Sequence, residues 1–206
     1  MTDRPLAMFP LSTVLFPSER MPLHVFEPRY QRLVADCLAG DRRFGVVLIA
    51  RGSEVGGGDQ RVDVGTLARI EAAEPLPDGR WYLEVVGLGL VRVTRWLDDD
   101  PYPHALVADC VIVPAHHIDR LRDAEAELRR VRALLSEFDD APALPGGLSF
   151  GDTPDDVAWG LCAQAPVTAF DRQRLLEASD PDERLALLVE LVRAVGEDVD
   201  RILAGG

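Results

Sequence analysis

The sequence contains no lysine, and all 22 of its basic residues are arginine. This absence excludes two kinds of chemistry. One is the P-loop lysine that binds nucleotide phosphates, and the other is the serine–lysine pair of one class of hydrolases. An enzyme that depends on either group is therefore not expected.

Cysteine is also scarce. The three cysteines, Cys37, Cys110 and Cys162, are odd in number and far apart. This pattern argues against a disulfide framework and is typical of a reducing compartment, so we expect a cytoplasmic protein.

Long apolar runs are missing as well. No stretch approaches the ~18 residues that a membrane-spanning helix needs. The first residues, with Asp3, Arg4 and several prolines, do not form the apolar centre of a secretory signal. The hydrophobic share of 47% nevertheless predicts a globular chain with an ample core.

Positive charge is in deficit, and the formal net charge is −13. Phosphate backbones and anionic lipids repel such a chain, so neither nucleic acid nor a membrane is an expected partner. Residues 116–206 hold 19 acidic residues and 10 arginines, a net charge of −9. One alternative function is therefore a structural partner that docks on a larger assembly through this acidic part.

Prolines interrupt the apolar segment 8–30 at positions 10, 17, 22 and 28. Because each proline fixes φ and removes a backbone donor, the segment predicts short extended pieces rather than one helix or a central strand. Its apolar residues are expected to enter a core: Leu11, Val14, Leu15, Phe16, Leu23, Val25 and Phe26.

A first helix is predicted from about Pro28 to Leu38. Proline is well tolerated at the first helical position, and Gly40 supplies a stop. The residues with helical spacing that should face the core are Tyr30, Leu33, Val34 and Cys37.

The following residues predict strands. The segments with strand patterns are Phe44–Arg51, Val64–Ala73, Trp81–Val86, Leu88–Trp96 and His104–Val113, and Asp78-Gly79 is a hairpin signal. Gly87 and Gly89 indicate a bulge. The glycine-rich stretch 51–60 precedes a strand rather than a helix, so we interpret it as a loop and not as a phosphate site. Residues 1–115 are thus predicted to form a small six-stranded open barrel with one early helix.

From Ile118 the apolar period becomes helical. Thr153-Pro154 and Asp180-Pro181 are helix starts, and Pro166 is expected to open a further helix. Residues 116–206 are therefore predicted to form an all-α four-helix bundle, which makes the whole chain an α+β protein.

The proline-rich segment 8–30 resembles the amino-terminal, substrate-binding domain of the Lon proteases, which is also found as small free-standing proteins. The likeness extends over roughly residues 7–205. It continues through Phe44–Ile49, Val64–Ile70, Asp78–Arg80, Leu83–Val93 and Tyr102–Val107. The residues that carry this signature are interpreted as structural: Pro10, Pro17, Glu27, Pro28, Arg29, Tyr30, Gly65 and Gly87. We expect Glu27 to favour the start of the helix and the hydroxyl of the buried Tyr30 to be hydrogen-bonded.

The resemblance implies a protein that captures unfolded or extended polypeptide segments. Without lysine the chain can supply neither the ATPase nor the protease activity of a full-length Lon protease, so no enzyme is expected. A protease or a chaperone is a further candidate partner. Candidate polypeptide-binding residues are apolar or aromatic: Trp81, Trp96, Tyr102, Phe16 and Met21.

Other chemistry has weaker support. His104, Cys110, His116 and His117 lack metal-ligand spacing, so no metal site is predicted. No serine lies in a Gly-x-Ser-x-Gly context, and neither a catalytic residue nor a cofactor is predicted. The alternative that remains beside polypeptide binding is a small-molecule- or metal-binding protein, or a hydrolase, on the same barrel.

Overall fold

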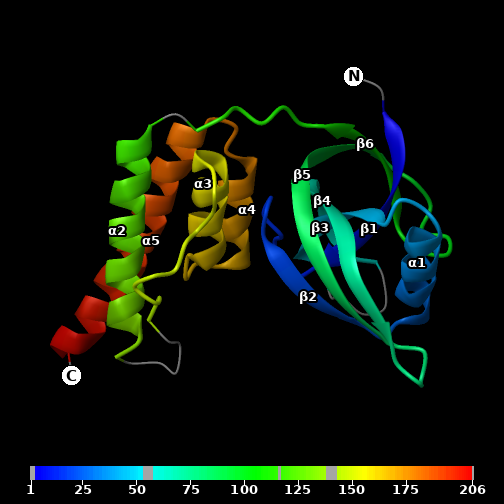
Figure 1. The fold of residues 1–206 in the computed structure, drawn as a ribbon, viewed down its shortest axis with the longest axis horizontal. Helices are drawn as coiled ribbons and strands as arrows, with labels where there is room; N and C mark the ends of the chain where they lie inside the picture. Colours follow the sequence, from blue (N-terminus) through cyan, green and yellow to red (C-terminus); the bar gives the residue numbers. More distant parts are fainter. Residues whose placement is uncertain (1–2, 53–57, 116, 138–142, 206) are drawn as a thin grey trace. The chain divides into compact units, whose positions relative to one another are not determined.

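The computed structural model describes residues 3–52, 58–115, 117–137 and 143–205. His116 and residues 53–57 of the glycine-rich stretch therefore lie outside the described residues. The chain divides into two compact units, Met1–Ile112 and Val113–Gly206 (Figure 1). The sequence pattern had placed this boundary three residues later.

The first unit is a mixed six-stranded sheet with one helix. Its order along the chain is β1 (Arg4–Leu11), β2 (Arg20–Val25), α1 (Pro28–Ala39), β3 (Arg43–Arg51), β4 (Gln60–Pro75), β5 (Trp81–Trp96) and β6 (His104–Asp109). In space the strands follow the order β2-β5-β4-β3-β1-β6, and β5 also pairs with β6. Only β1 and β3 run parallel among these pairings.

The expectation that the proline-rich segment contains no central strand is wrong for β1. Despite its prolines, β1 pairs with β6 on one side and with β3 on the other. Arg4–Ala7 pairs with β6, and Met8–Leu11 pairs with β3. Each half of β1 thus has a strand neighbour on one side only. Pro10 lies in the half that pairs with β3 alone, so its missing N–H does not interrupt a second ladder.

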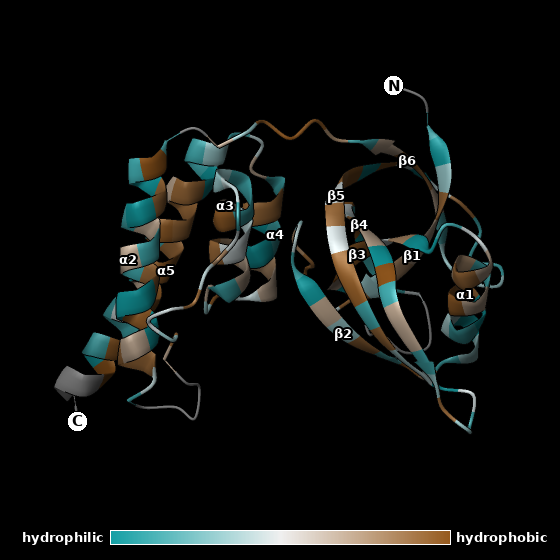
Figure 2. Ribbon diagram, in the orientation of Figure 1, coloured by the Kyte–Doolittle hydropathy of each residue, from teal (hydrophilic) through white to brown (hydrophobic). Residues whose placement is uncertain are grey.

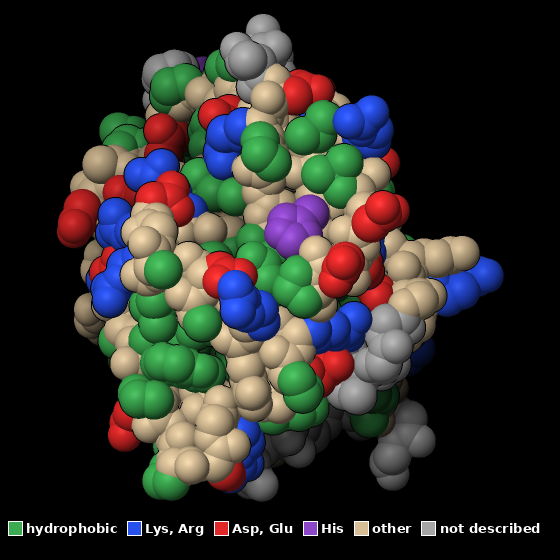
Figure 3. Space-filling model, turned by 90° about the vertical axis from the view of Figure 1, so that its right-hand side faces the viewer, with side chains coloured by type: hydrophobic (Ala, Val, Ile, Leu, Met, Phe, Trp, Pro, Cys, Tyr) green, Lys and Arg blue, Asp and Glu red, His purple; other side chains and the backbone are tan. Residues whose placement is uncertain are grey.

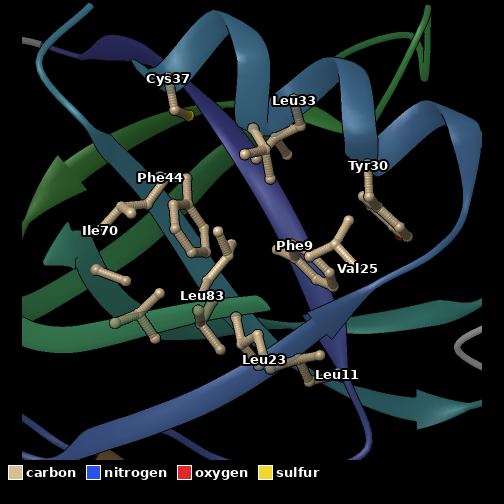
Figure 4. Packing of buried hydrophobic residues seen from close by; sticks show 14 of the residues in the cluster. Phe9, Leu11, Leu23, Val25, Tyr30, Leu33, Cys37, Phe44, Ile70 and Leu83 are labelled. Carbon is tan, nitrogen blue, oxygen red and sulfur yellow. The ribbon is translucent and has the colours of Figure 1, made fainter. Parts of the chain in front are cut away.

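The larger core cluster of this unit fills the space between α1 and the strands. Figure 4 shows Tyr30, Leu33 and Cys37 of α1 pointing toward the sheet, with Phe9 and Phe44 between them and Leu83. The predicted inner face of the first helix is confirmed, and Leu33 and Val34 are fully buried. A second cluster includes Met8, Val47, Val91 and Val107.

Phe26 is the exception among the predicted core residues, since its side chain is 50% exposed. Leu23 and Val25 point inward from β2, and side chains of a strand alternate between its two faces. Phe26 is out of phase with them, so it points outward.

The predicted hairpin and bulge are present. Gly79 N–H donates to the Leu76 carbonyl at the β4–β5 turn. The register of β4 against β5 shifts between Leu67 and Ala68, opposite the segment Gly87–Gly89. Strand β6 is shorter than expected, because it ends at Asp109 and not at Val113.

The described part of the second unit contains four helices: α2 (Ile118–Leu135), α3 (Pro154–Gln164), α4 (Ala169–Glu177) and α5 (Pro181–Gly205). Figure 2 shows hydrophobic and hydrophilic residues alternating along α2, as expected of a helix with one buried face. In the described residues, no helix has both the length and the apolar character that crossing a membrane requires.

Helix starts in this unit follow local capping rules. Thr153 and Asp156 form the capping box of α3. Asp180 accepts hydrogen bonds from the N–H groups of Asp182 and Glu183 at the start of α5. The expected start at Pro166 is wrong: α4 begins at Ala169, because the Thr168 side chain accepts the Asp171 N–H and caps it.

Candidate functional site

A small apolar pocket opens beside strand β2 and is called the β2 pocket here. Its volume is ≈ 140 Å³, and residues 22–27 line it together with Phe9, Leu11 and Tyr30. The lining comes from β1, from β2 and from the start of α1, so the pocket reaches the larger core cluster of this unit.

Local sequence rules position the walls of this pocket. Alternation along β2 turns Leu23 and Val25 inward. Pro28 begins α1 and places Tyr30 on its buried face. The rings of Tyr30 and Phe9 stack with centroids 4.2 Å apart and an interplanar angle of 12°. The pocket wall is thus built by the proline-punctuated segment.

The outer edge of β2 adds main-chain groups to this site. Within the described sheet β2 pairs with β5 alone. Gly87 N–H donates to the Glu19 carbonyl, which makes this a hydrogen-bonded pair in a ladder whose pairs alternate. By that alternation the main chains of Pro22 and His24 face the open edge. The His24 N–H and the carbonyls of both residues can therefore receive an extended chain.

Three exposed rings stand beside the pocket and are called the aromatic trio: His24, Phe26 and Tyr82. His24 stacks on Tyr82 with centroids 4.7 Å apart, and it lies 6.0 Å from Phe26. Tyr82 is 51% exposed, like Phe26. This group was not predicted from the sequence, although the alternation along β2 places His24 on its outer face. Figure 3, viewed from the side on which α1 lies, shows hydrophobic side chains that reach the surface between charged ones.

Charges at the pocket are largely paired. Arg29 Nε donates to Glu27 Oε2 at 3.1 Å, and the Arg29 guanidinium lies 4.5 Å from the centroid of the Tyr30 ring. Burial raises the pKa of Tyr30 to about 12, so its hydroxyl keeps its proton at neutral pH. The expected hydrogen bond of this hydroxyl is not found among the described residues.

The predicted polypeptide-binding residues do not form one surface. Phe16 is fully buried and Tyr102 is 7% exposed, with its hydroxyl donating to Asp36, so neither offers accessible area. Trp81 and Met21 are half-buried against the cluster that contains the β2 pocket. Trp96 packs against the second cluster instead.

Trp96 belongs to a group of charges around Arg61. The Arg61 guanidinium lies 4.9 Å from the Trp96 ring centroid and bonds to Asp59 and Asp99. The side chains of Arg61 and Asp59 are 9% and 2% exposed. Asp99 is thus a paired member of the acidic run Asp98-Asp99-Asp100.

An Asp59→Asn variant should lose less stability in acid than the parent protein. Burial acts to raise the pKa of the Asp59 carboxyl, but hydrogen bonds from Arg61 outweigh it and hold that pKa below its ordinary value. A lowered folded-state pKa contributes stability that is present above the unfolded-state pKa and is lost as pH falls through the folded value. The fall in melting temperature from about pH 5 to about pH 3 should therefore be smaller in the variant.

The matched control is Asp119→Asn, at a carboxylate that is 96% exposed. It should keep the pH profile of the parent. An Asp59→Asn profile that coincides with the parent profile would contradict the role given to this ion pair.

The residues considered for metal binding are scattered. His104 stacks on Tyr102, and His117 contacts Asp182 at 2.5 Å. Cys110 is half-buried at the end of β6. In the ranges that the structure describes, no group of three or more His, Cys, Asp or Glu side chains could hold a metal ion.

Comparison with known proteins agrees with the fold. The family model of the ATP-dependent protease La (LON) substrate-binding domain matches residues 5–194. A Lon protease of Xanthomonas oryzae pv. oryzae is 32% identical over 196 residues, which are 91% of this chain and 22% of that protein. A "LON peptidase N-terminal domain and RING finger protein" of Schizosaccharomyces pombe is 23% identical over 87% of this chain and 44% of its own length.

Two solved structures have the same fold. A Lon N-terminal domain protein from Xanthomonas campestris superposes with a TM-score of 0.63 and 28% identity, covering 91% of this chain and 98% of that one. The N-terminal domain of a Mycobacterium avium complex Lon protease has a TM-score of 0.59, with 16% identity, over 92% and 98% of the two chains. The chain spans less than a quarter of the Lon proteases that it matches. It belongs to the family of the Lon substrate-binding domain.

Proposed function

We propose that this protein binds extended polypeptide segments without chemical change. The β2 pocket receives one side chain of the segment, while the open edge of β2 and the aromatic trio contact its neighbours. One observation carries this proposal: an apolar pocket of side-chain size lies beside a strand edge whose main-chain groups pair with no other described strand. Strand edges and side-chain pockets are a recurring means of peptide recognition.

Proline limits how the open edge is used. Pro22 offers a carbonyl but no N–H at the centre of the edge, so a long additional strand cannot form there. Pairing is restricted to a few residues around His24. The edge therefore suits a short extended segment held mainly by its side chains.

The size of the pocket supports one inserted ring or leucine-sized side chain. A cavity of about 150 Å³ lined by apolar residues holds a benzene molecule. An aromatic side chain buries about 150–250 Å², so a single insertion gives an affinity that is modest alone and rises with neighbouring contacts. Trp81 and Met21 remain in this proposal, and Trp96, Phe16 and Tyr102 are left out of it.

We also propose the architecture that the sequence predicted, a small barrel followed by a four-helix bundle. The strand pairings support the barrel. Strands β1, β3, β4, β5 and β6 each pair with the next, and β6 pairs again with β1, so the pairings form a closed circuit. A small barrel with β2 attached to β5 satisfies this circuit. We propose that α2–α5 form the four-helix bundle and that the two parts, near residues 1–115 and 116–206, act as separate domains.

The proposal places recognition in this chain and chemistry elsewhere. The absence of lysine removes the P-loop and serine–lysine groups. A protease or a chaperone that receives the bound segment is the proposed partner, and the three separate cysteines support a reducing, cytoplasmic setting.

The double variant Phe26→Ala/Tyr82→Ala should bind an unfolded reporter polypeptide about tenfold or more weakly than the parent protein. Aromatic side chains contribute much of the binding free energy at such surfaces. The double substitution removes two of the three rings of the aromatic trio beside the pocket. Affinity can be measured by fluorescence anisotropy with a permanently unfolded, labelled polypeptide, after thermal melting confirms that the variant is folded.

The matched control removes the same kind of exposed apolar area from another part of the unit. Leu88 and Val111 are 36% and 85% exposed, and neither lines the β2 pocket. Leu88→Ala/Val111→Ala should bind the reporter as the parent does. Equal affinities for the two double variants, or no binding by the parent protein, would overturn the proposed site.

A further inference from the structure

The Tyr30 hydroxyl has no hydrogen-bond partner among the residues that the structure describes. Tyr30 is 3% exposed and lines the β2 pocket. Its ring is held by Phe9 on one face and lies close to the Arg29 guanidinium. No residue that the structure describes makes a hydrogen bond with its hydroxyl, whereas the comparably buried Tyr102 donates to Asp36 at 3.0 Å.

The Tyr30 hydroxyl is not among the described buried side-chain atoms that lack a partner, so it still reaches the water of the pocket. A ligand that fills the pocket displaces this water, and the hydroxyl is then left without a partner unless the ligand supplies one. Such groups in a pocket wall select ligands that supply the missing partner. The other polar side chains of the β2 pocket are the exposed His24, which stacks on Tyr82, and Glu27, which is paired with Arg29. Tyr30 is therefore the buried polar side chain of this wall that can form a hydrogen bond with a ligand.

We propose, on the basis of the polypeptide-binding function above, that the β2 pocket prefers a tyrosine of the bound segment and that Tyr30 Oη forms a hydrogen bond with the hydroxyl of that tyrosine. The inserted tyrosine ring fills the β2 pocket, and its hydroxyl meets the Tyr30 hydroxyl in the pocket wall. Tyr30 thus determines specificity within a mainly apolar site.

The geometry favours a side-chain hydroxyl over a main-chain group of the ligand. The main chain of a bound segment follows the open edge of β2, where the Pro22 and His24 carbonyls and the His24 N–H are available. Tyr30 is 3% exposed and lines the pocket, so a side chain that enters the pocket is the part of the segment that meets it. Because the high pKa of Tyr30 keeps its proton in place, the hydroxyl can donate to a tyrosine hydroxyl or accept from it.

The test compares short, unstructured peptides that differ at one central position, which is Tyr, Phe, Leu or Ala. Isothermal titration calorimetry gives their affinities for the parent protein, for Tyr30→Phe and for Tyr102→Phe. The parent should bind the Tyr peptide about 3- to 10-fold more tightly than the Phe peptide, as one net hydrogen bond allows. In Tyr30→Phe this preference should disappear, because the substitution keeps the ring and removes only the hydroxyl.

Tyr102→Phe is the matched control, since it makes the same chemical change at a buried tyrosine that lies outside the proposed site. It should keep the preference for the Tyr peptide. Equal affinities of the parent for the Tyr and Phe peptides, or a preference that persists in Tyr30→Phe, would overturn the role of Tyr30 and leave the proposed function intact. Failure of all four peptides and of the unfolded reporter to bind would instead overturn the proposed function itself.

Discussion

Gly87→Ala is expected to lower the free energy of unfolding of the first unit by about 3 kcal/mol, the upper end of what an extra methyl in a packed region costs. A Cβ atom at this position would lie 2.1 Å from the Phe16 carbonyl oxygen and 3.1 Å from Thr66 Cγ2. The segment around Phe16 therefore crosses β5 at a distance that only glycine permits.

This close crossing is held by several hydrogen bonds, so it cannot widen without loss. Ser18 N–H donates to the Gly87 carbonyl at 2.9 Å, and Gly87 N–H donates to the Glu19 carbonyl at 3.0 Å. Thr66, which is fully buried, donates its hydroxyl to the Leu15 carbonyl. A methyl group at position 87 must break some of these bonds or push the segment away from the sheet.

Urea unfolding measured by circular dichroism provides the test, with the midpoint compared at unchanged slope. Gly89→Ala is the matched control in the same strand, because no heavy atom lies within 4 Å of a Cβ at that position. Its free energy of unfolding should change by no more than about 0.5 kcal/mol. If the two variants unfold at the same urea concentration, the proposed close approach at Gly87 is wrong.

Arg184→Met should destabilise the second unit by about 3 kcal/mol, because Arg184 is a buried cation with several specific contacts. Arg184 is 3% exposed, and its guanidinium carbon lies 3.8 Å from the centroid of the Trp159 ring. Its Nε donates to the Leu175 carbonyl at 3.2 Å, and its Nη2 donates to the Ala178 carbonyl. Methionine fills similar space but leaves both carbonyls without this donor.

The electrostatic environment explains how this charge is tolerated. Both acceptor carbonyls belong to the end of α4, where the helix dipole is negative and the last carbonyls lack helical partners. Burial lowers the pKa of the Arg184 guanidinium. The face of the Trp159 ring attracts its positive charge. Arg184 therefore closes the carboxyl end of α4 and joins it to α3 and α5.

Thermal unfolding followed by tryptophan fluorescence in a Trp81→Phe/Trp96→Phe background reports on this unit, since Trp159 is then the remaining tryptophan. Arg193→Met is the control, because Arg193 is 58% exposed and its nearest carboxylate, Glu127, lies 3.8 Å away. It should melt close to the parent. Arg184→Lys should fall between the parent and the methionine variant, since it keeps the charge but not the fork of donors. A methionine variant as stable as the parent would refute the role of Arg184.

Several elements could be predicted from the sequence because their causes are local. Helix α1 was predicted from Pro28 and from the helical spacing of Tyr30, Leu33, Val34 and Cys37. The β4–β5 turn was predicted from Asp78-Gly79. Thr153 with Asp156 gave the start of α3. The family was also recognisable, because the proline-rich segment has an uncommon pattern.

The candidate site was less predictable, because it depends on residues that meet only after folding. Phe26 was assigned to the core, and Tyr82 was not considered, yet the pairing of β2 with β5 brings His24 against Tyr82 on the outer face. Asp99 pairs with Arg61 although 38 positions separate them. No local pattern carries such information.

The sequence alone determined the helix starts, the hairpin turn, the absence of lysine chemistry and the membership of a family. These follow from backbone preferences and residue types that act within a few positions. Only the tertiary structure decided that β1 is paired on both sides, that Gly87 lies against Phe16 and that Tyr30 lines a pocket. Those features arise from strand pairing and packing between distant segments, where the free energy depends on partners that no short stretch of sequence specifies.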